Sequence, residues 1–320
     1  IQQKIIPIDN QPPILMNAAP AAPSVRRLAR ELGVDVNKIP GSSPSGRISL
    51  NDVKAFVKKI NEEKKSTTVS SEQVGTKILP LPDFTKFGTI ERKPMSGIRT
   101  KTAEHLSYAW ATIPHVTQFD KADITELEKI RRQFAPNVEK QGGKLTMTSI
   151  LAKVISSALK VFPQFNASVD MTSKEIVYKH YVNIGVAVDT ENGLIVPVVR
   201  DVDKKNISQI SKEINELAEK SRIRKISLDE LQGGCFTISN LGGVGGTYFT
   251  PIVNSPEAAI IGVSRASIEP VYKENNFVPR LMLPLSLSYD HRIIDGADGI
   301  RFLRWVIDAL EQPMKILVEG

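Results

Sequence analysis

The sequence Leu281-Met-Leu-Pro-Leu-Ser-Leu-Ser-Tyr-Asp-His-Arg-Ile-Ile-Asp-Gly296 combines a strand pattern with a cluster of polar residues. Leucine occupies every second position over residues 281–288, which is the alternation of a β-strand with one buried face. His291 and Asp295 follow where this strand should end, and Gly296 permits a sharp turn before a helical pattern. Because a strand end holds side chains rigidly beside a cleft, His291 is the best acid–base candidate among the four histidines.

Patterns upstream of this stretch indicate a mixed α/β or α+β domain over residues 89–320. Apolar residues at helical spacing predict helices over Thr148–Val161 and Ile207–Arg222. An Asn-Gly turn between two strand patterns favours some antiparallel pairing. The predicted strands are Tyr181–Val188, Leu194–Val199, Cys235–Ser239 and Leu281–Ser288.

A much smaller, all-helical unit is expected over residues 23–60. It reads as two short helices around a Gly/Ser-rich loop, and the second helix, ending near Ile60, begins with a Ser-x-x-Asp capping pattern. The Pro- and Ala-rich residues 1–22 and the polar residues 61–88 have the composition of linkers. The chain is therefore expected to contain two folded units joined by a flexible linker.

The net charge of +7 is concentrated in the small unit. Residues 23–60 contain eight basic and three acidic residues, a net +5, so the rest of the chain is nearly neutral. A basic segment of this kind is a candidate for binding nucleic acid. Apart from Phe56, the segment has no side chain that would stack on a nucleic-acid base, which disfavours nucleic-acid binding.

Other kinds of chemistry have little support in the sequence. The single cysteine, Cys235, lies in an apolar strand pattern, which fits a structural thiol in a reducing compartment such as the cytoplasm. The four scattered histidines give no metal-ligand cluster. The Gly-rich residues 242–247 lack the lysine of a phosphate-binding loop, so a tight turn is the preferred interpretation over a ligand cradle. No apolar run approaches the length of a membrane span, and we expect no membrane association.

A family resemblance adds to this interpretation of the histidine. His291-Arg-Ile-Ile-Asp295-Gly296 resembles the His-x-x-x-Asp-Gly motif of the dihydrolipoyl acyltransferases of 2-oxo acid dehydrogenase complexes and of their fold relative chloramphenicol acetyltransferase. The motif alone is weak, and a structural histidine is the alternative. Upstream, Val25–Gly33 resembles the family's peripheral subunit-binding domain. The likeness to the catalytic domain also includes Ile113–Val116, Phe162–Ser168, Gly185–Thr190, Gly193–Pro197 and Phe236–Gly242.

The resemblance implies transfer of an acyl group from dihydrolipoamide to coenzyme A on a mixed α/β fold. His291 would take the thiol proton, Ser239 would donate its hydroxyl to the oxyanion, and Asp295 would hold the local geometry by pairing with Arg99. The likeness is closest to acetyltransferases of bacterial pyruvate dehydrogenases. The alternatives are succinyl or branched-chain acyl groups, or a catalytically silent scaffold that only binds partners. For Ser239, an ordinary strand-end hydroxyl is the alternative.

The same resemblance implies where coenzyme A and lipoamide would bind. Lipoamide would come from a lipoyl domain outside this chain. Arg131 and Asp189 could equally be surface charges, and a further family contact falls on Ala218 and is not carried over. The implied coenzyme A contacts are Arg131, Thr146, Asp189, Ser239 and Asn240.

Protein partners are implied as well. Arg26, Arg30 and Arg47 occupy the positions at which the small domain of this family anchors lipoamide dehydrogenase and the pyruvate decarboxylase component. A local net charge of +5 suits electrostatic steering toward an acidic partner surface. The catalytic domain is expected to form homotrimers with the active site between subunits, and the trimers to build a large, cubic core.

Overall fold

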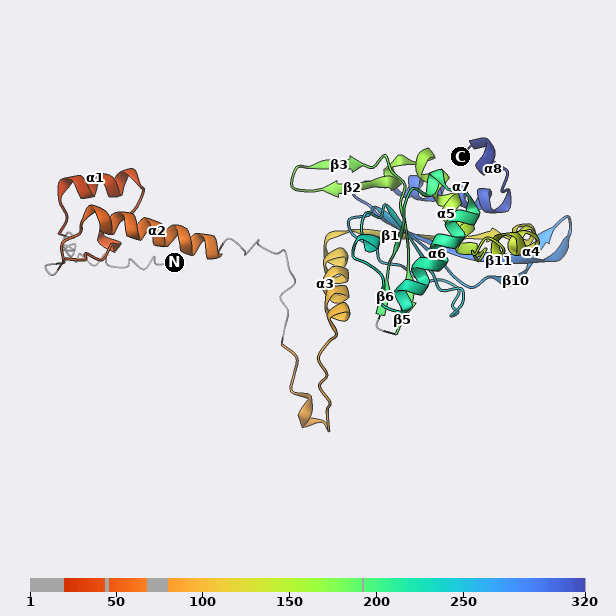
Figure 1. Cartoon of the computed structure of the whole chain (residues 1–320), viewed down its shortest axis with the longest axis horizontal. Coiled ribbons are helices and arrows are strands. Elements are labelled where there is room, and N and C mark those ends of the chain that lie inside the picture. Colours follow the sequence, from red (N-terminus) through yellow and green to blue (C-terminus); the bar gives the residue numbers. More distant parts are fainter. Residues whose placement is uncertain (1–19, 44–45, 68–79, 192, 320) are drawn as a thin grey trace, which may run out of the picture. The chain divides into compact units, whose positions relative to one another are not determined.

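The computed structural model describes residues 20–43, 46–67, 80–191 and 193–319 (Figure 1). The chain divides into two compact units, Ile1–Asp83 and Phe84–Gly320. The first predicted linker, residues 1–22, lies almost wholly outside the described residues, as do residues 68–79 of the second.

The small unit contains two helices, α1 (Pro23–Glu31) and α2 (Leu50–Thr67), and a short 3-10 helix, η1 (Val36–Lys38). The predicted capping pattern is confirmed, because the Ser49 amide donates to Asp52 Oδ2 at 2.8 Å and the Asp52 amide donates to Ser49 Oγ at 3.3 Å. The core of this unit comprises Val25, Ala29, Ile39, Ile48 and Val53.

Helix α2 is longer than the sequence pattern predicts. The apolar periodicity ends at Ile60, and the segment from residue 61 was expected to be linker, yet the helix continues through Thr67. Glutamate and lysine, which fill residues 62–65, are strong helix formers and extend a helix that has already nucleated. The polar composition of residues 61–67 thus did not reveal that they are helical.

The large unit is built on a seven-stranded mixed sheet, which confirms the predicted α/β class. Its strand order is β1-β11-β9-β8-β4-β7, and β10 pairs with β11. Strand β8 runs parallel to β4 and β9, and the other pairs are antiparallel. The strands are β1 (His115–Asp123), β4 (Ile184–Val186), β7 (Val198–Val199), β8 (Phe236–Asn240), β9 (Ala259–Val263), β10 (Ser267–Lys273) and β11 (Asn276–Asp290).

Two predicted strands are divided between the main sheet and a small hairpin. The pattern at Tyr181–Val188 yields β4 and the start of β5 (Val188–Thr190), and the pattern at Leu194–Val199 yields β6 (Gly193–Ile195) and β7. Pro197 cannot donate to a ladder, so pairing stops between β6 and β7. The predicted antiparallel hairpin is confirmed, with Thr190 opposite Gly193. A second hairpin joins β2 (Ala167–Asp170) and β3 (Glu175–Tyr178).

Most helices of the large unit cover one face of the sheet. Both long helices predicted from periodicity are present, and α5 begins one residue earlier than expected. Phe165 stacks on Phe302 of α7 with ring centroids 4.0 Å apart, in a core shared by α5, α7 and the sheet. The helices are α3 (Gly97–Thr112), α4 (Thr125–Glu139), α5 (Met147–Val161), α6 (Ile207–Arg222), α7 (Gly296–Glu311) and α8 (Lys315–Glu319), with short 3-10 turns at η2 (Phe84–Lys86), η3 (Pro163–Asn166), η4 (Val202–Lys204) and η5 (Asp229–Leu231).

The opposite face of the sheet is lined by small polar residues. The leucines at 283, 285 and 287 point into the main core, as the alternation predicts, while Ser286 and Ser288 point to the other side. Ser239 shares that side with them. A small apolar cluster of Ala109, Ile113, Val253 and Ile260 attaches α3 to this face.

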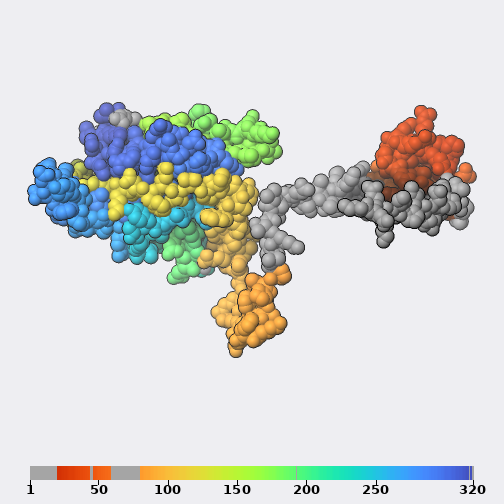
Figure 2. Space-filling model, turned by 180° about the vertical axis from the view of Figure 1, so that it is seen from behind, coloured from red at the N-terminus to blue at the C-terminus, as the bar shows by residue number. Residues whose placement is uncertain are grey.

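Strand β11 starts at Asn276, five residues before the predicted start, and its first half forms an arm with β10 that projects from the sheet (Figure 1). The large unit also begins with a segment that stands away from the rest of that unit, drawn in orange in Figure 2. None of the helices in the described ranges has the length and apolar character needed to cross a membrane.

Candidate active site

His291 lies immediately after the last residue of β11, as predicted. Its amide donates to the Pro114 carbonyl at 3.1 Å, and the amide of Asp290 donates to the Ala258 carbonyl at 2.9 Å. The buried carboxylate of Asp290 accepts from Arg292 Nε at 2.9 Å. The backbone is thus fixed on both sides, while the His291 ring is exposed and makes no hydrogen bond to a described residue.

The turn after His291 is supported by Tyr289 and Gln118. Gln118 Nε2 donates to the Gly296 carbonyl at 2.9 Å at the start of α7. A Cβ at Gly299 would lie 2.7 Å from the Tyr289 ring and 2.8 Å from Gln118 Oε1, so only glycine lets the helix approach this closely. Burial raises the pKa of the Tyr289 hydroxyl, and the charge of Asp295 adds to the shift.

The predicted ion pair between Asp295 and Arg99 is not formed. Asp295 is the N-cap residue of α7, but its side chain makes neither a capping hydrogen bond nor an ion pair within the described ranges. Arg99 lies in the first turn of α3, where its Nη2 is 3.9 Å from the Cβ position of Gly193 in β6. The start of α3 thus lies beside the β5–β6 hairpin.

Ser239 is the fourth residue of β8 and is partly buried. Its hydroxyl makes no hydrogen bond to any residue that the structure describes, so it is available as a donor. The next residue, Asn240, is fixed: its Nδ2 donates to Thr148 Oγ1 at 2.8 Å, and its Oδ1 accepts from the Gly242 amide at 2.8 Å. This turn at Gly242 agrees with the predicted tight turn.

One chain does not bring Ser239 and His291 together. Ser239 pairs with Gly262, and Gly262 pairs with Ser286. From Ser286, β11 continues four residues to Asp290, which adds about 13 Å at the usual rise of a strand. Two strand spacings add about 10 Å sideways. The two side chains therefore lie near opposite ends of the sheet, too far apart to act on the same bond.

Two adjoining pockets collect the predicted coenzyme A residues. Each has a volume of about 370 Å³, and they share Lys144, Thr146 and Asn240. Arg131 lines the first and Asp189 lines the second. Only Ser239 among the predicted residues is not in their lining, and it directly precedes Asn240.

The lining also contains functional candidates that sequence reasoning missed. Lys144 borders both pockets, and Arg222 borders the second, so each could face a phosphate group. The signal for Lys144 was its place in the sequence, two residues before Thr146 and after two glycines. Ala218, which was set aside, lines the second pocket as well.

Arg131 is held in one orientation by two hydrogen bonds within the chain. Its Nε donates to Glu128 Oε2 at 2.7 Å and its Nη1 donates to the Leu145 carbonyl at 2.8 Å. The hydrogen bond from Arg131 lowers the pKa of Glu128 to about 2, so this carboxylate is charged near neutral pH. Thr146 caps the N-terminus of α5 through a capping box with Ser149.

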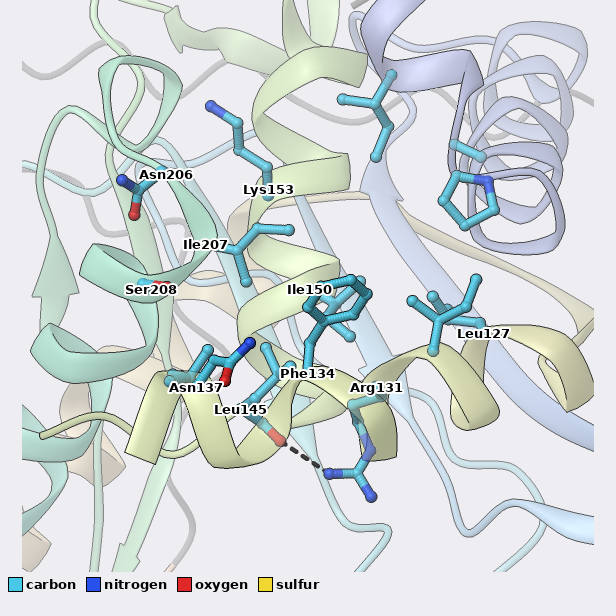
Figure 3. A pocket seen from close by; sticks show the side chains of 15 residues that line it. Leu127, Arg131, Phe134, Asn137, Leu145, Ile150, Lys153, Asn206, Ile207 and Ser208 are labelled. Atoms are coloured by element: carbon cyan, nitrogen blue, oxygen red, sulfur yellow. Dashed lines mark hydrogen bonds between the residues drawn. The ribbon is translucent and has the colours of Figure 1, made fainter. Parts of the chain in front are cut away.

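Arg131 also borders a third pocket, of about 500 Å³, between α4, α5, α6 and the end of α7 (Figure 3). The side chains around it are mainly aliphatic or aromatic, among them Leu127, Phe134, Ile150 and Ile207. Its lining includes neither Ser239 nor His291, so this pocket is separate from the predicted acyl-transfer groups.

Two other reactive residues have structural roles. His115 Nε2 accepts from the Val253 amide at 3.0 Å, so its Nδ1, 2.8 Å from the Ile113 carbonyl, carries the proton and donates. Its ring stacks on Trp110. Cys235 is buried, which raises the pKa of its thiol, as expected for a structural cysteine. Within the described ranges, His, Cys, Asp and Glu form no cluster that could hold a metal ion.

Glu257 is a buried acid that the sequence did not reveal. Its Oε2 accepts from Thr237 Oγ1 at 2.6 Å and its Oε1 accepts from Asn254 Nδ2 at 3.1 Å. Asn254 Oδ1 in turn is 3.0 Å from His105 Nε2 on α3. Burial raises the pKa of Glu257 to about 7, and the two hydrogen bonds oppose that shift without cancelling it.

This carboxyl should make the large unit less stable as the pH rises. Between pH 4.5, the ordinary pKa, and about 7, the folded state holds a proton that the unfolded state has lost, so stability falls with rising pH. The span corresponds to about 3 kcal/mol. We expect Glu257→Gln to remove most of this dependence in chemical denaturation at pH 5 and pH 8. Exposed Glu274→Gln is the control, and an unchanged slope in Glu257→Gln would contradict the assignment.

Residues 87–318 match the model of the 2-oxoacid dehydrogenases acyltransferase catalytic domain. Residues 19–54 match the e3 binding domain. The fold and both matches define an acyltransferase catalytic domain with an attached binding domain, and the chain belongs to the 2-oxoacid dehydrogenase acyltransferase family.

Curated relatives are named dihydrolipoyllysine-residue acetyltransferase component of pyruvate dehydrogenase complex. The one from Cupriavidus necator is 48% identical over 94% of this chain and 55% of that protein. The one from Haemophilus influenzae is 46% identical, with the same coverage. This chain thus spans about half the length of the curated relatives it matches.

Two solved structures are also similar. One comes from work on the roles of a serine, a histidine and an asparagine in the catalytic mechanism of Azotobacter vinelandii dihydrolipoamide acetyltransferase. The other is the cubic core of a pyruvate dehydrogenase multienzyme complex. Each is 50% identical, covers 76% of this chain and 100% of its own, and superposes with a TM-score of 0.74.

Proposed function

We propose that this chain transfers the acetyl group of acetyl-dihydrolipoamide to coenzyme A and forms the core of a pyruvate dehydrogenase complex. The observation that carries the proposal is the position of Ser239 beside Asn240, which borders both pockets. In the Azotobacter protein, the serine, histidine and asparagine that were studied for catalysis are spaced along the chain as Ser239, His291 and Asp295 are here. The names of the relatives support acetyl as the acyl group.

The chemistry assigns one task to each side chain. His291 removes the proton from the coenzyme A thiol, and the thiolate attacks the thioester carbonyl of acetyl-dihydrolipoamide. Ser239 donates its hydroxyl to the oxyanion that forms. When the tetrahedral intermediate collapses, the carbon–sulfur bond to dihydrolipoamide breaks, and His291 returns the proton to the departing sulfur. Asp295 holds the turn that carries His291.

The active site is proposed to form between copies of the chain. Because Ser239 and His291 lie near opposite ends of one sheet, a site that uses both needs His291 from a second copy. Large apolar side chains are available for such contacts: Phe87, in the segment before α3, is 85% exposed, and Trp110 on α3 is 67% exposed. A closed trimer gives three such sites, and trimers would build a cubic core of the kind solved for the relative.

The small unit is proposed to bind lipoamide dehydrogenase and the pyruvate decarboxylase component. Its match to the e3 binding domain supports a role in partner capture. Arg30 and Arg47 are exposed, while Arg26 is partly buried and its Nε lies 3.4 Å from the Ala21 carbonyl. Arg30 and Arg47 are therefore the better placed of the three to contact an acidic surface.

Loss of these charges should weaken partner capture without affecting acetyl transfer. We expect Arg30→Ala and Arg47→Ala each to slow association with lipoamide dehydrogenase in surface plasmon resonance, most clearly at low salt. Arg27→Ala is a matched control, because Arg27 lies on α1 with Arg30 but pairs with Glu31 at 3.0 Å. Normal association of both variants at physiological salt would exclude the anchoring role.

A coenzyme A acetylation assay tests the proposed reaction. The assembled protein is given coenzyme A with acetyl-, succinyl- or isobutyryl-dihydrolipoamide, and the thioester product is measured. The proposal predicts transfer with acetyl as the best donor. If transfer is fastest with the succinyl or isobutyryl donor, the chain belongs to a related complex with that acyl specificity. If the assembled core transfers none of the three groups, it acts as a partner-binding scaffold.

A further inference from the structure

The sheet face that carries Ser239 has a gap at Gly262, the residue paired with Ser239 on β9. A Cβ at Gly262 would lie 2.6 Å from Cζ of Phe249 and 2.9 Å from its Cε1, which is closer than side chains approach one another. The Phe249 ring therefore rests end-on above the Gly262 backbone, in the space that any other residue would fill.

This position places the ring beside Ser239. Paired residues on neighbouring strands share a face, and their Cβ positions are about 5 Å apart. The end of the ring is thus within about 8 Å of Cβ of Ser239. Ser286 is the next residue in the same row, on β11, and its buried hydroxyl has no hydrogen-bond partner among the described residues. The Phe249 ring thus lies between Ser239, which is partly exposed, and Ser286, which is buried.

We infer that Phe249 determines the size of the acyl group that the chain transfers, a role that rests on the proposed transfer reaction. When the Ser239 hydroxyl donates to the oxyanion, the acyl carbon lies within a few ångströms of that hydroxyl, and its substituent comes within contact distance of the ring, about 4 Å. A methyl group fits this space. A branched or longer acyl chain clashes with the Phe249 ring, which packs against the Gly262 backbone.

The test compares acyl donors in assembled wild-type protein, Phe249→Ala and Phe249→Leu. The quantity measured is kcat/KM for isobutyryl-dihydrolipoamide relative to acetyl-dihydrolipoamide, with coenzyme A in excess. Phe249→Ala should raise this ratio about 10- to 100-fold, and Phe249→Leu should raise it less. Tyr248→Ala is the matched control. The Tyr248 ring lies 5.4 Å from the ring of Phe119, and Phe119 is two strands away from Gly262 in the same row of paired residues. Loss of the Tyr248 ring should therefore leave the donor ratio unchanged.

Gly262→Ala gives an independent check, because the added methyl group must displace the ring that separates Ser239 from Ser286. It should lower kcat/KM for acetyl transfer. The inference is overturned if the donor ratios of both Phe249 variants stay within about twofold of wild type while acetyl transfer persists. If wild type transfers none of the donors, the proposed function fails, and this inference fails with it. Persisting acetyl transfer with unchanged donor ratios marks failure of the inference alone. Should Phe249→Ala not assemble, the ratio of Phe249→Leu decides.

Discussion

His291→Ala should lower kcat for acetyl transfer to coenzyme A by about 10²- to 10⁴-fold while KM for coenzyme A changes little. In the proposed reaction, the imidazole acts on the thiol proton in the transition state, and it lines neither of the two pockets proposed for coenzyme A. Its ring is exposed and makes no hydrogen bond to a described residue, so its loss should not disturb the fold. Initial rates on assembled protein measure the effect.

Raising the pH should partly restore the activity of His291→Ala. A thiol with a pKa of about 8.5 ionises in solution above that pH, so the solvent then supplies the thiolate that the missing base no longer generates. His115→Ala is not an adequate control for base loss, because both His115 nitrogens hold backbone groups and its removal would loosen α3. Near-normal activity of assembled His291→Ala at neutral pH would rule out general-base catalysis by this residue.

The fold class and the position of His291 were predictable because their causes are local. Alternating leucines at 283, 285 and 287 define one buried face of β11, and apolar spacing defines α5 and α6. The coenzyme A residues came from family resemblance, and four of them line the two pockets. Their roles as ligand contacts stay predictions.

What could not be predicted depends on contacts between distant segments. The absence of the predicted Asp295–Arg99 pair could not be foreseen, because the sequence does not show where α3 begins relative to the β5–β6 hairpin. Arg99 lies at that hairpin instead. Glu257 is buried because Thr237 and Asn254, which come from different segments, close around it. The register that separates Ser239 from His291 follows from two strand pairings that no local pattern encodes.

Ser239→Ala should also be a severe loss, about 10²- to 10³-fold in kcat, as for removal of one oxyanion donor. High pH should not rescue it, because the missing donor is needed however the thiolate is made. The hydroxyl is partly buried and forms no hydrogen bond to a described residue, so the substitution should leave the sheet intact. The contrast in pH response separates the donor from the base.

The separation of Ser239 and His291 within one chain is tested most directly by mixing these two variants. Ser239→Ala and His291→Ala chains are expressed together in equal amounts, and the co-assembled protein is assayed at neutral pH. If each site takes Ser239 from one copy and His291 from its neighbour, about a quarter of the sites in random trimers are intact, and activity should rise to about a quarter of wild type. Co-assembly of either variant with the double variant should give no gain. Mixed assemblies that stay as inactive as their parents would contradict a site shared between copies.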